Sequence, residues 1–144
     1  MMLSKHFHLD ELTVSQTAAR RGLDNTPPPA ILAQLRETAQ KMELVRTILG
    51  SKPIIVTSGY RSPAVNRAVK GSRTSAHMRG EAVDFICPGF GSPLAICRAL
   101  SIQKDLPYDQ IIEEGSWVHI GFAKFPRREV WTKRNGEMIR GLAA

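Results

Sequence analysis

Residues 75–84 read Ser-Ala-His-Met-Arg-Gly-Glu-Ala-Val-Asp, and this stretch decides how the rest of the chain is interpreted. Its second half alternates in the manner of a strand, so Ala82 and Asp84 share one face. The small alanine leaves room beside the carboxylate. Gly80 allows a backbone conformation barred to other residues, and the turn that it supports can bring His77 back over the strand toward Asp84.

A third candidate ligand, His119, belongs to a second alternating stretch, residues 116–122. Trp117, His119 and Gly121 share one face of it, and the glycine clears space beside the imidazole. Two histidines and one carboxylate form a ligand set that suits zinc and leaves a fourth coordination position open, which is typical of catalytic rather than structural sites. If the three side chains converge, we expect a metal-dependent hydrolase.

The bulk properties of the chain indicate one ordinary globular domain over residues 1–144, with 42% hydrophobic and 23% charged residues. No apolar run approaches the roughly 20 residues that a membrane span requires, so we expect no transmembrane segment. Residues 1–12 lack the apolar core of a secretory signal, which predicts synthesis in the cytoplasm and another route to any site of action outside it. Cys87 and Cys97 form no CxxC pair and are expected to be buried, reduced thiols.

The net charge of +7, from 20 basic and 13 acidic residues, favours polyanionic partners such as an anionic cell envelope. A solvated basic face is the simpler interpretation of the same charge. No helix-turn-helix, zinc-finger or RNA-binding signature is present, so we expect no specific nucleic-acid partner. The densest basic cluster comprises Lys124, Arg127, Arg128, Lys133, Arg134 and Arg140.

The order of periodic segments predicts an α+β fold, a small antiparallel sheet with helices packed on one side. Apolar residues recur every three or four positions over residues 30–49, which indicates the longest helix. Residues 53–57 are β-branched and indicate a buried strand. The expected helices cover residues 14–21, 30–49, 62–69 and 92–103; the expected strands cover residues 53–57, 81–87, 109–114 and 116–122; a weak helical pattern begins at Val130.

The pattern Ser75-x-His77-x-x-Gly80-x-Ala82-x-Asp84 resembles the SxHxxGxAxD signature of the zinc DD-peptidase family. Its members are D-Ala-D-Ala carboxypeptidases, dipeptidases and L-alanyl-D-glutamate endolysins of the hedgehog/DD-peptidase fold. Residues 58–61 (Ser-Gly-Tyr-Arg) are similar to the family's arginine-bearing turn, and residues 117–119 (Trp-Val-His) to its third-ligand strand. Residues 7–25 resemble the start of the short single-domain members that phages and prophages often encode. The resemblance extends over residues 5–125.

The resemblance implies a role for each matching residue. His77, Asp84 and His119 match the zinc ligands, and zinc would polarise the scissile carbonyl and lower the pKa of its bound water to about 7. Arg61 matches the arginine that stabilises the developing oxyanion or holds the substrate; an ordinary surface salt bridge is the alternative. Ser75 matches a serine near the substrate, although a turn-capping role is equally compatible, and Trp117 is placed beside the substrate with it.

The general base is the assignment in which this sequence departs from the family. Many relatives carry an acidic residue three positions before the last histidine ligand, and Ser116 stands there. We expect Glu114 to serve instead, because it ends its strand next to the turn, with Glu113 and then Asp109 as the alternatives. A site without an efficient base would make the protein a metal-binding, hedgehog-like module that binds cell wall without turnover.

The expected activity is therefore that of a zinc metallopeptidase that hydrolyses peptidoglycan stem peptides. We expect the protein to be a monomer. Residue patterns leave the bond open, since a D-Ala-D-Ala carboxypeptidase and an L-Ala-D-Glu endopeptidase would share these ligands. They also leave open whether the enzyme is a free endolysin, a virion-borne lysin or a host cell-wall enzyme.

Overall fold

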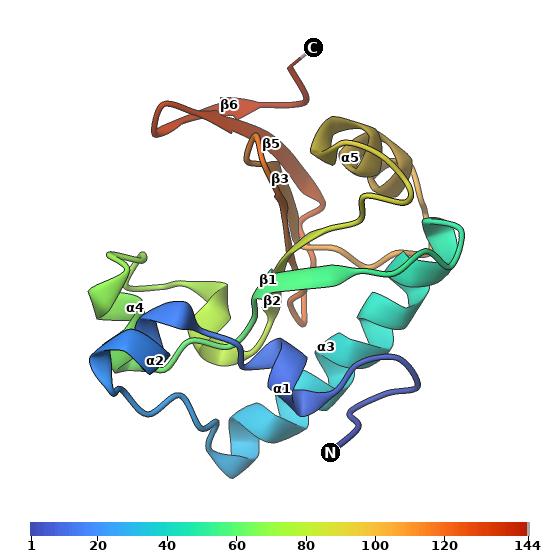
Figure 1. Ribbon diagram of the computed structural model, residues 1–144. Coiled ribbons are helices and arrows are strands. Elements are labelled where there is room, and N and C mark those ends of the chain that lie inside the picture. Colours follow the sequence, from blue (N-terminus) through green and yellow to red (C-terminus); the bar gives the residue numbers. More distant parts are fainter. Residues whose placement is uncertain (144) are drawn as a thin grey trace.

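The computed structural model of the protein describes residues 1–143 and shows a mixed α/β architecture built on one six-stranded sheet (Figure 1). The strand order is β1-β2-β4-β3-β5-β6. The strands are β1 (Ile55–Ser58), β2 (Ala82–Ile86), β3 (Gln110–Glu113), β4 (Val118–Gly121), β5 (Glu129–Arg134) and β6 (Glu137–Arg140). The helices are α1 (Leu9–Leu12), α2 (Gln16–Arg21), α3 (Pro29–Ile48), α4 (Pro63–Ala68) and α5 (Pro93–Ser101), with a 3-10 turn η1 (Ala76–Arg79).

Three helices, α2, α4 and α5, begin directly after a serine whose side chain caps the first turn. The Oγ atoms of Ser15, Ser62 and Ser92 each accept a hydrogen bond from the backbone N–H three residues later, at 3.0 to 3.2 Å. Each bond satisfies a donor that the first turn would otherwise leave free. The four helices expected from the sequence are confirmed, with ends displaced by a few residues.

The hydrophobic core fills the space between one face of the sheet and the helices α3 and α5. From β2, Val83 and Phe85 point to this side, while Asp84 points to the opposite face. The core residues of α3 and α5 are Leu35, Ala39, Met42, Val45, Ile96, Cys97 and Leu100. Cys87 and Cys97 are buried, free thiols, as expected. One sheet face is therefore sealed by helices, and the other is left for a site.

The strand β1 corrects the prediction that residues 53–57 form a buried strand. It lies at an edge of the sheet, paired only with β2 within the described residues, and Ile55 is 50% exposed. Edge strands present one free side to solvent, and β-branched composition alone does not distinguish them from central strands.

The chain end corrects two further expectations. The tail from Val130 is no helix: β5 and β6 form a hairpin whose turn holds Asn135 and Gly136 at φ of 52° and 79°. Asn-Gly is the strongest hairpin signal because both turn positions need positive φ. The sheet is also not wholly antiparallel, because β5 pairs with β3 in parallel. The α+β class itself is confirmed.

Across the described part of the chain, no helix combines the length and the apolar character needed to traverse a lipid bilayer.

The positions of Phe85 and Ile55 in the sheet predict that replacing them with alanine lowers the stability of the protein by different amounts. Phe85→Ala should lower the free energy of unfolding by about 3–5 kcal/mol, because it empties a fully buried site on the core face. Ile55→Ala on the edge strand should cost less than about 1 kcal/mol. Urea unfolding followed by circular dichroism measures both, and equal losses would contradict the edge position of β1.

Candidate metal centre

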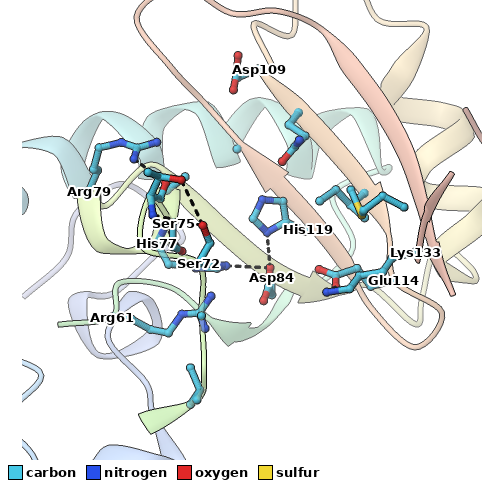
Figure 2. A pocket seen from close by; sticks show the side chains of 18 of the residues that line it. Arg61, Ser72, Ser75, His77, Arg79, Asp84, Asp109, Glu114, His119 and Lys133 are labelled. Atoms are coloured by element: carbon cyan, nitrogen blue, oxygen red, sulfur yellow. Dashed lines mark hydrogen bonds and ion pairs between the residues drawn. The ribbon is translucent and has the colours of Figure 1, made fainter. Parts of the chain in front are cut away.

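Three side chains from three elements converge on the open face of the sheet: His77 from η1, Asp84 from β2 and His119 from β4 (Figure 2). One donor atom from each lies within 4.8 Å of the other two. Asp84 Oδ1 is 3.2 Å from His77 Nε2 and 2.8 Å from His119 Nδ1. Asp84 and His119 are directly opposite in the antiparallel register of β2 and β4, which explains their approach.

The imidazole of His77 is oriented by the backbone rather than by chance. Its Nδ1 lies 2.7 Å from the carbonyl oxygen of Gly59, which only accepts, so Nδ1 carries the proton and donates. Nε2 is then left with its lone pair directed at Asp84. Metal-ligating histidines are oriented by this kind of outer hydrogen bond, which fixes the tautomer. Gly80, at φ of 72°, ends η1 in the conformation that the sequence predicted.

The Asp84 carboxyl is held as an anion inside the protein. Burial raises its pKa, but its interactions with the imidazoles of His119 and His77 outweigh that effect, so its pKa lies well below the ordinary 3.8. Two imidazole nitrogens and one ionised carboxylate oxygen within a few ångströms are the donor types and spacing that zinc prefers. The three residues therefore fit a zinc ion, with a side open to the cavity.

The ligand cluster faces a cavity of about 610 Å³. Figure 2 shows Asp109 at one end of it, Glu114 and Lys133 at the other, and His119 with Asp84 between them. Arg61 also lines the cavity, with its guanidinium directed toward Asp84. Burial lowers the pKa of Arg61, and the charges of Asp84 and Glu114 oppose that shift. Its buried Nε has no hydrogen-bond partner in residues 1–143. Arg61 therefore does not form the ordinary surface salt bridge that was the alternative to a role at the site.

The two neighbouring glutamates point to opposite faces of the sheet. Glu114 lines the cavity and accepts a hydrogen bond from Trp117 Nε1 at 3.2 Å. Glu113 is 1% exposed, pairs with Arg134 and accepts from the Gly115 N–H, so it faces away from the ligand cluster. The geometry therefore favours Glu114 over Glu113 as the acid that can reach the site.

Asp109 lines the cavity but is already engaged. Its Oδ1 accepts from the Arg127 backbone N–H and Nε at 2.9 and 3.0 Å, and its Oδ2 from Arg127 NH2 at 2.8 Å. Those hydrogen bonds lower the pKa of Asp109. A carboxylate saturated in this way is a poor proton acceptor, which removes the third candidate base.

The remaining expected site residues lie at the cavity as well. Ser75 lines it, and its Oγ accepts from the His77 N–H at 3.2 Å, which is the capping role left open above. Trp117 lines it at the turn between β3 and β4. The sequence did not single out Gly59, Lys133 or Met138 as parts of the site, although the Asn-Gly turn could have indicated the hairpin that carries the last two.

Comparison with known proteins agrees with this geometry. The family model described as Peptidase M15 matches residues 5–121, and the chain belongs to this family of zinc-dependent metallopeptidases. The zinc D-Ala-D-Ala carboxypeptidase of Streptomyces albus G is 33% identical over 78 residues, which cover 54% of the chain. The matched residues span 29% of that relative's length. The resemblance to the zinc DD-peptidase family is thereby confirmed over residues 5–121.

The contact of Gly59 with the N-terminal segment predicts a coupled loss of stability and metal affinity. A Cβ at this position would lie 2.3 Å from the Leu12 carbonyl oxygen, so Gly59→Ala must displace the backbone whose carbonyl holds His77. Zinc affinity, measured by competition with a chelator, should fall about 10- to 100-fold. Gly89→Ala is the matched control, because its Cβ would meet Lys52 at 3.4 Å, an ordinary contact, and zinc affinity should not change.

The Asp109–Arg127 contact predicts a pH-dependent contribution to stability. Because the folded pKa of Asp109 is below the ordinary 3.8, the contribution is complete above pH 3.8 and is lost as the pH falls through the folded pKa. Asp109→Asn should therefore destabilise the protein at pH 7 by less than about 1 kcal/mol, since Arg127 is largely exposed. The difference in unfolding free energy from wild type should shrink as the pH falls below about 4 and the carboxyl titrates. A difference that grows on acidification would contradict the assignment.

Proposed function

We propose that the protein is a zinc-dependent peptidase that hydrolyses peptidoglycan stem peptides and acts on the cell wall in the manner of an endolysin. The observation that carries the proposal is the convergence of His77, Asp84 and His119 beside Arg61 and Glu114 on one open cavity. The family supplies the peptidase class. The substrate is supported by the name of the relative in Streptomyces albus G and by the basic surface of the chain, which suits an anionic envelope.

Each of the cavity residues has a separate role in the proposed hydrolysis. Zinc, when held by His77, Asp84 and His119, supplies a Lewis acid that polarises the scissile carbonyl and acidifies a water. Arg61 presents a fixed positive charge where negative charge develops on the carbonyl oxygen. Glu114, held by Trp117, accepts a proton from the attacking water and transfers it to the leaving amine.

A metal-binding module without turnover is the second candidate, motivated by Ser116 in place of an acid. Ser116 is exposed at the turn, and Glu114 presents its carboxylate to the cavity from the preceding strand. An acid is thus present at the site by another route, which supports turnover. The bond that is cut, D-Ala-D-Ala or L-Ala-D-Glu, follows from the substrate test below, and phage or prophage origin stays a prediction.

Purified protein loaded with zinc should bind about one ion per chain and release new termini from peptidoglycan that mass spectrometry identifies. Glu114→Gln should lower kcat by about 10²- to 10⁴-fold and leave zinc content unchanged, because it removes a proton acceptor and no ligand. Glu113→Gln is the matched control. It breaks a buried ion pair, so it should lower the melting temperature but leave kcat close to that of wild type.

Two results would contradict the proposal. Intact peptidoglycan after incubation with the zinc-loaded wild type would exclude turnover and favour the binding module. Full activity in Glu114→Gln together with lost activity in a folded Glu113→Gln variant would transfer the role of base to Glu113.

A further inference from the structure

The hairpin formed by β5 and β6 adds a wall to the cavity that the family match does not include. The matched residues end at 121, whereas the hairpin covers residues 129–140. Lys133 of β5 and Met138 of β6 are directly opposite in the antiparallel register, and both line the cavity. One cationic and one apolar side chain therefore form a cross-strand pair over the site.

The sheet fixes where this pair lies. The parallel register aligns Thr132 with Glu113, so the next residues along each strand, Lys133 and Glu114, come side by side. The ion pair between Arg134 and Glu113 joins β5 to β3 in this register. The hydrogen bond from Thr132 Oγ1 to the Gly141 carbonyl, 2.7 Å, joins β5 to the segment that follows β6. Lys133 is thus placed at the Glu114 end of the cavity by contacts that do not involve the Lys133 side chain. Figure 2 shows it beside Glu114.

Lys133 has more unused binding capacity than Arg127 and Arg128, two other members of the late basic cluster. Arg127 is bound to both oxygens of Asp109, and Arg128 donates to the backbone carbonyls of Leu106 and Gln103. The Lys133 ammonium makes one long ion pair, 3.9 Å to Glu114 Oε1, and no hydrogen bond within residues 1–143. It is 46% exposed on a flexible four-carbon chain, so its three donors can reach a ligand in the cavity.

The charge of the cavity indicates what that ligand carries. Asp84, Asp109 and Glu114 are its acidic lining residues. The basic lining residues are Arg61, Lys70, Arg79, Arg127 and Lys133. The protein charge of the lining is therefore positive before any metal is added, which favours an anionic group on the substrate.

Resting on the proposed function, we propose that Lys133 and Met138 form a specificity subsite that binds a carboxylate of the peptide on the Glu114 side of the cleaved bond. Lys133 pairs with the carboxylate, and Met138 packs against the adjacent apolar carbons. Peptides in which that carboxylate is a carboxamide lose the pairing, so the hairpin distinguishes acidic from amidated stem peptides.

The test compares one stem peptide with derivatives in which each carboxylate in turn is converted to a carboxamide. Wild type should show a kcat/KM about fivefold higher for the acid than for one of the amides, mainly through KM, as for a half-exposed ion pair. Lys133→Met should abolish this preference, Lys133→Arg should restore it and Lys133→Glu should reverse it. Lys104→Ala, which removes an exposed lysine outside the cavity, is the matched control and should keep the preference.

Thermal unfolding of each variant separates folding defects from loss of the subsite, and Lys133→Arg and Lys133→Glu keep the inference testable if Lys133→Met is unstable. An equal loss of kcat/KM on acid and amide peptides in Lys133→Met would overturn the inference, because it would mean that Lys133 acts only through Glu114 or the fold. If wild type cleaves no peptide, the proposed function fails, but calorimetric titration of zinc-loaded protein still decides the subsite. Wild type should then bind the acid about fivefold more tightly than the amide, and Lys133→Met should bind both equally.

Discussion

The buried carboxylate of Asp84 is the constraint around which the rest of the site is arranged. An isolated anion in the interior costs several kcal/mol or more, so the fold must supply compensation from outside its own strand. It does so from two directions: β4 brings His119 opposite Asp84, and η1 brings His77 over it. A divalent cation would add to this compensation, so metal binding and the stability of the central strands are coupled.

Residues beyond the three candidate ligands also support the site. The carbonyl that orients His77 belongs to Gly59, and the next residue, Tyr60, donates its backbone N–H to the Leu12 carbonyl at 2.7 Å. The N-terminal helix α1 is thereby joined to the ligand cluster through two hydrogen bonds, one from the His77 side chain to Gly59 and one between the backbones of Tyr60 and Leu12. Because Gly59 has no Cβ, the two segments approach more closely than any other residue would allow. The first residues of the family match therefore support the site although they supply no ligand.

The local signals of the sequence predicted most of the framework. Apolar periodicity placed the longest helix, and alternation placed Asp84 and His119 on the correct faces, because these depend on a few neighbouring residues. The convergence of the ligands came from the resemblance, since no spacing rule brings residue 119 to residue 84. The parallel pairing of β5 with β3 is a long-range choice that composition does not encode. The choice between Glu113 and Glu114 needed the register of β3, although alternation already required the two to face opposite sides.

The separation of the ligand strands from the hairpin has an evolutionary consequence. All three candidate metal ligands lie on central strands or on the turn beside them, and the wall that carries Lys133 and Met138 lies on the last two strands, at one end of the sheet. Outer strands can be exchanged, lengthened or re-sequenced at little cost to the core, because they contribute few of its buried side chains. With the proposed subsite on the hairpin, recognition and metal binding lie on separate parts of the sheet. Exchanging the last hairpin should then alter the range of substrates while His77, Asp84 and His119 stay in place.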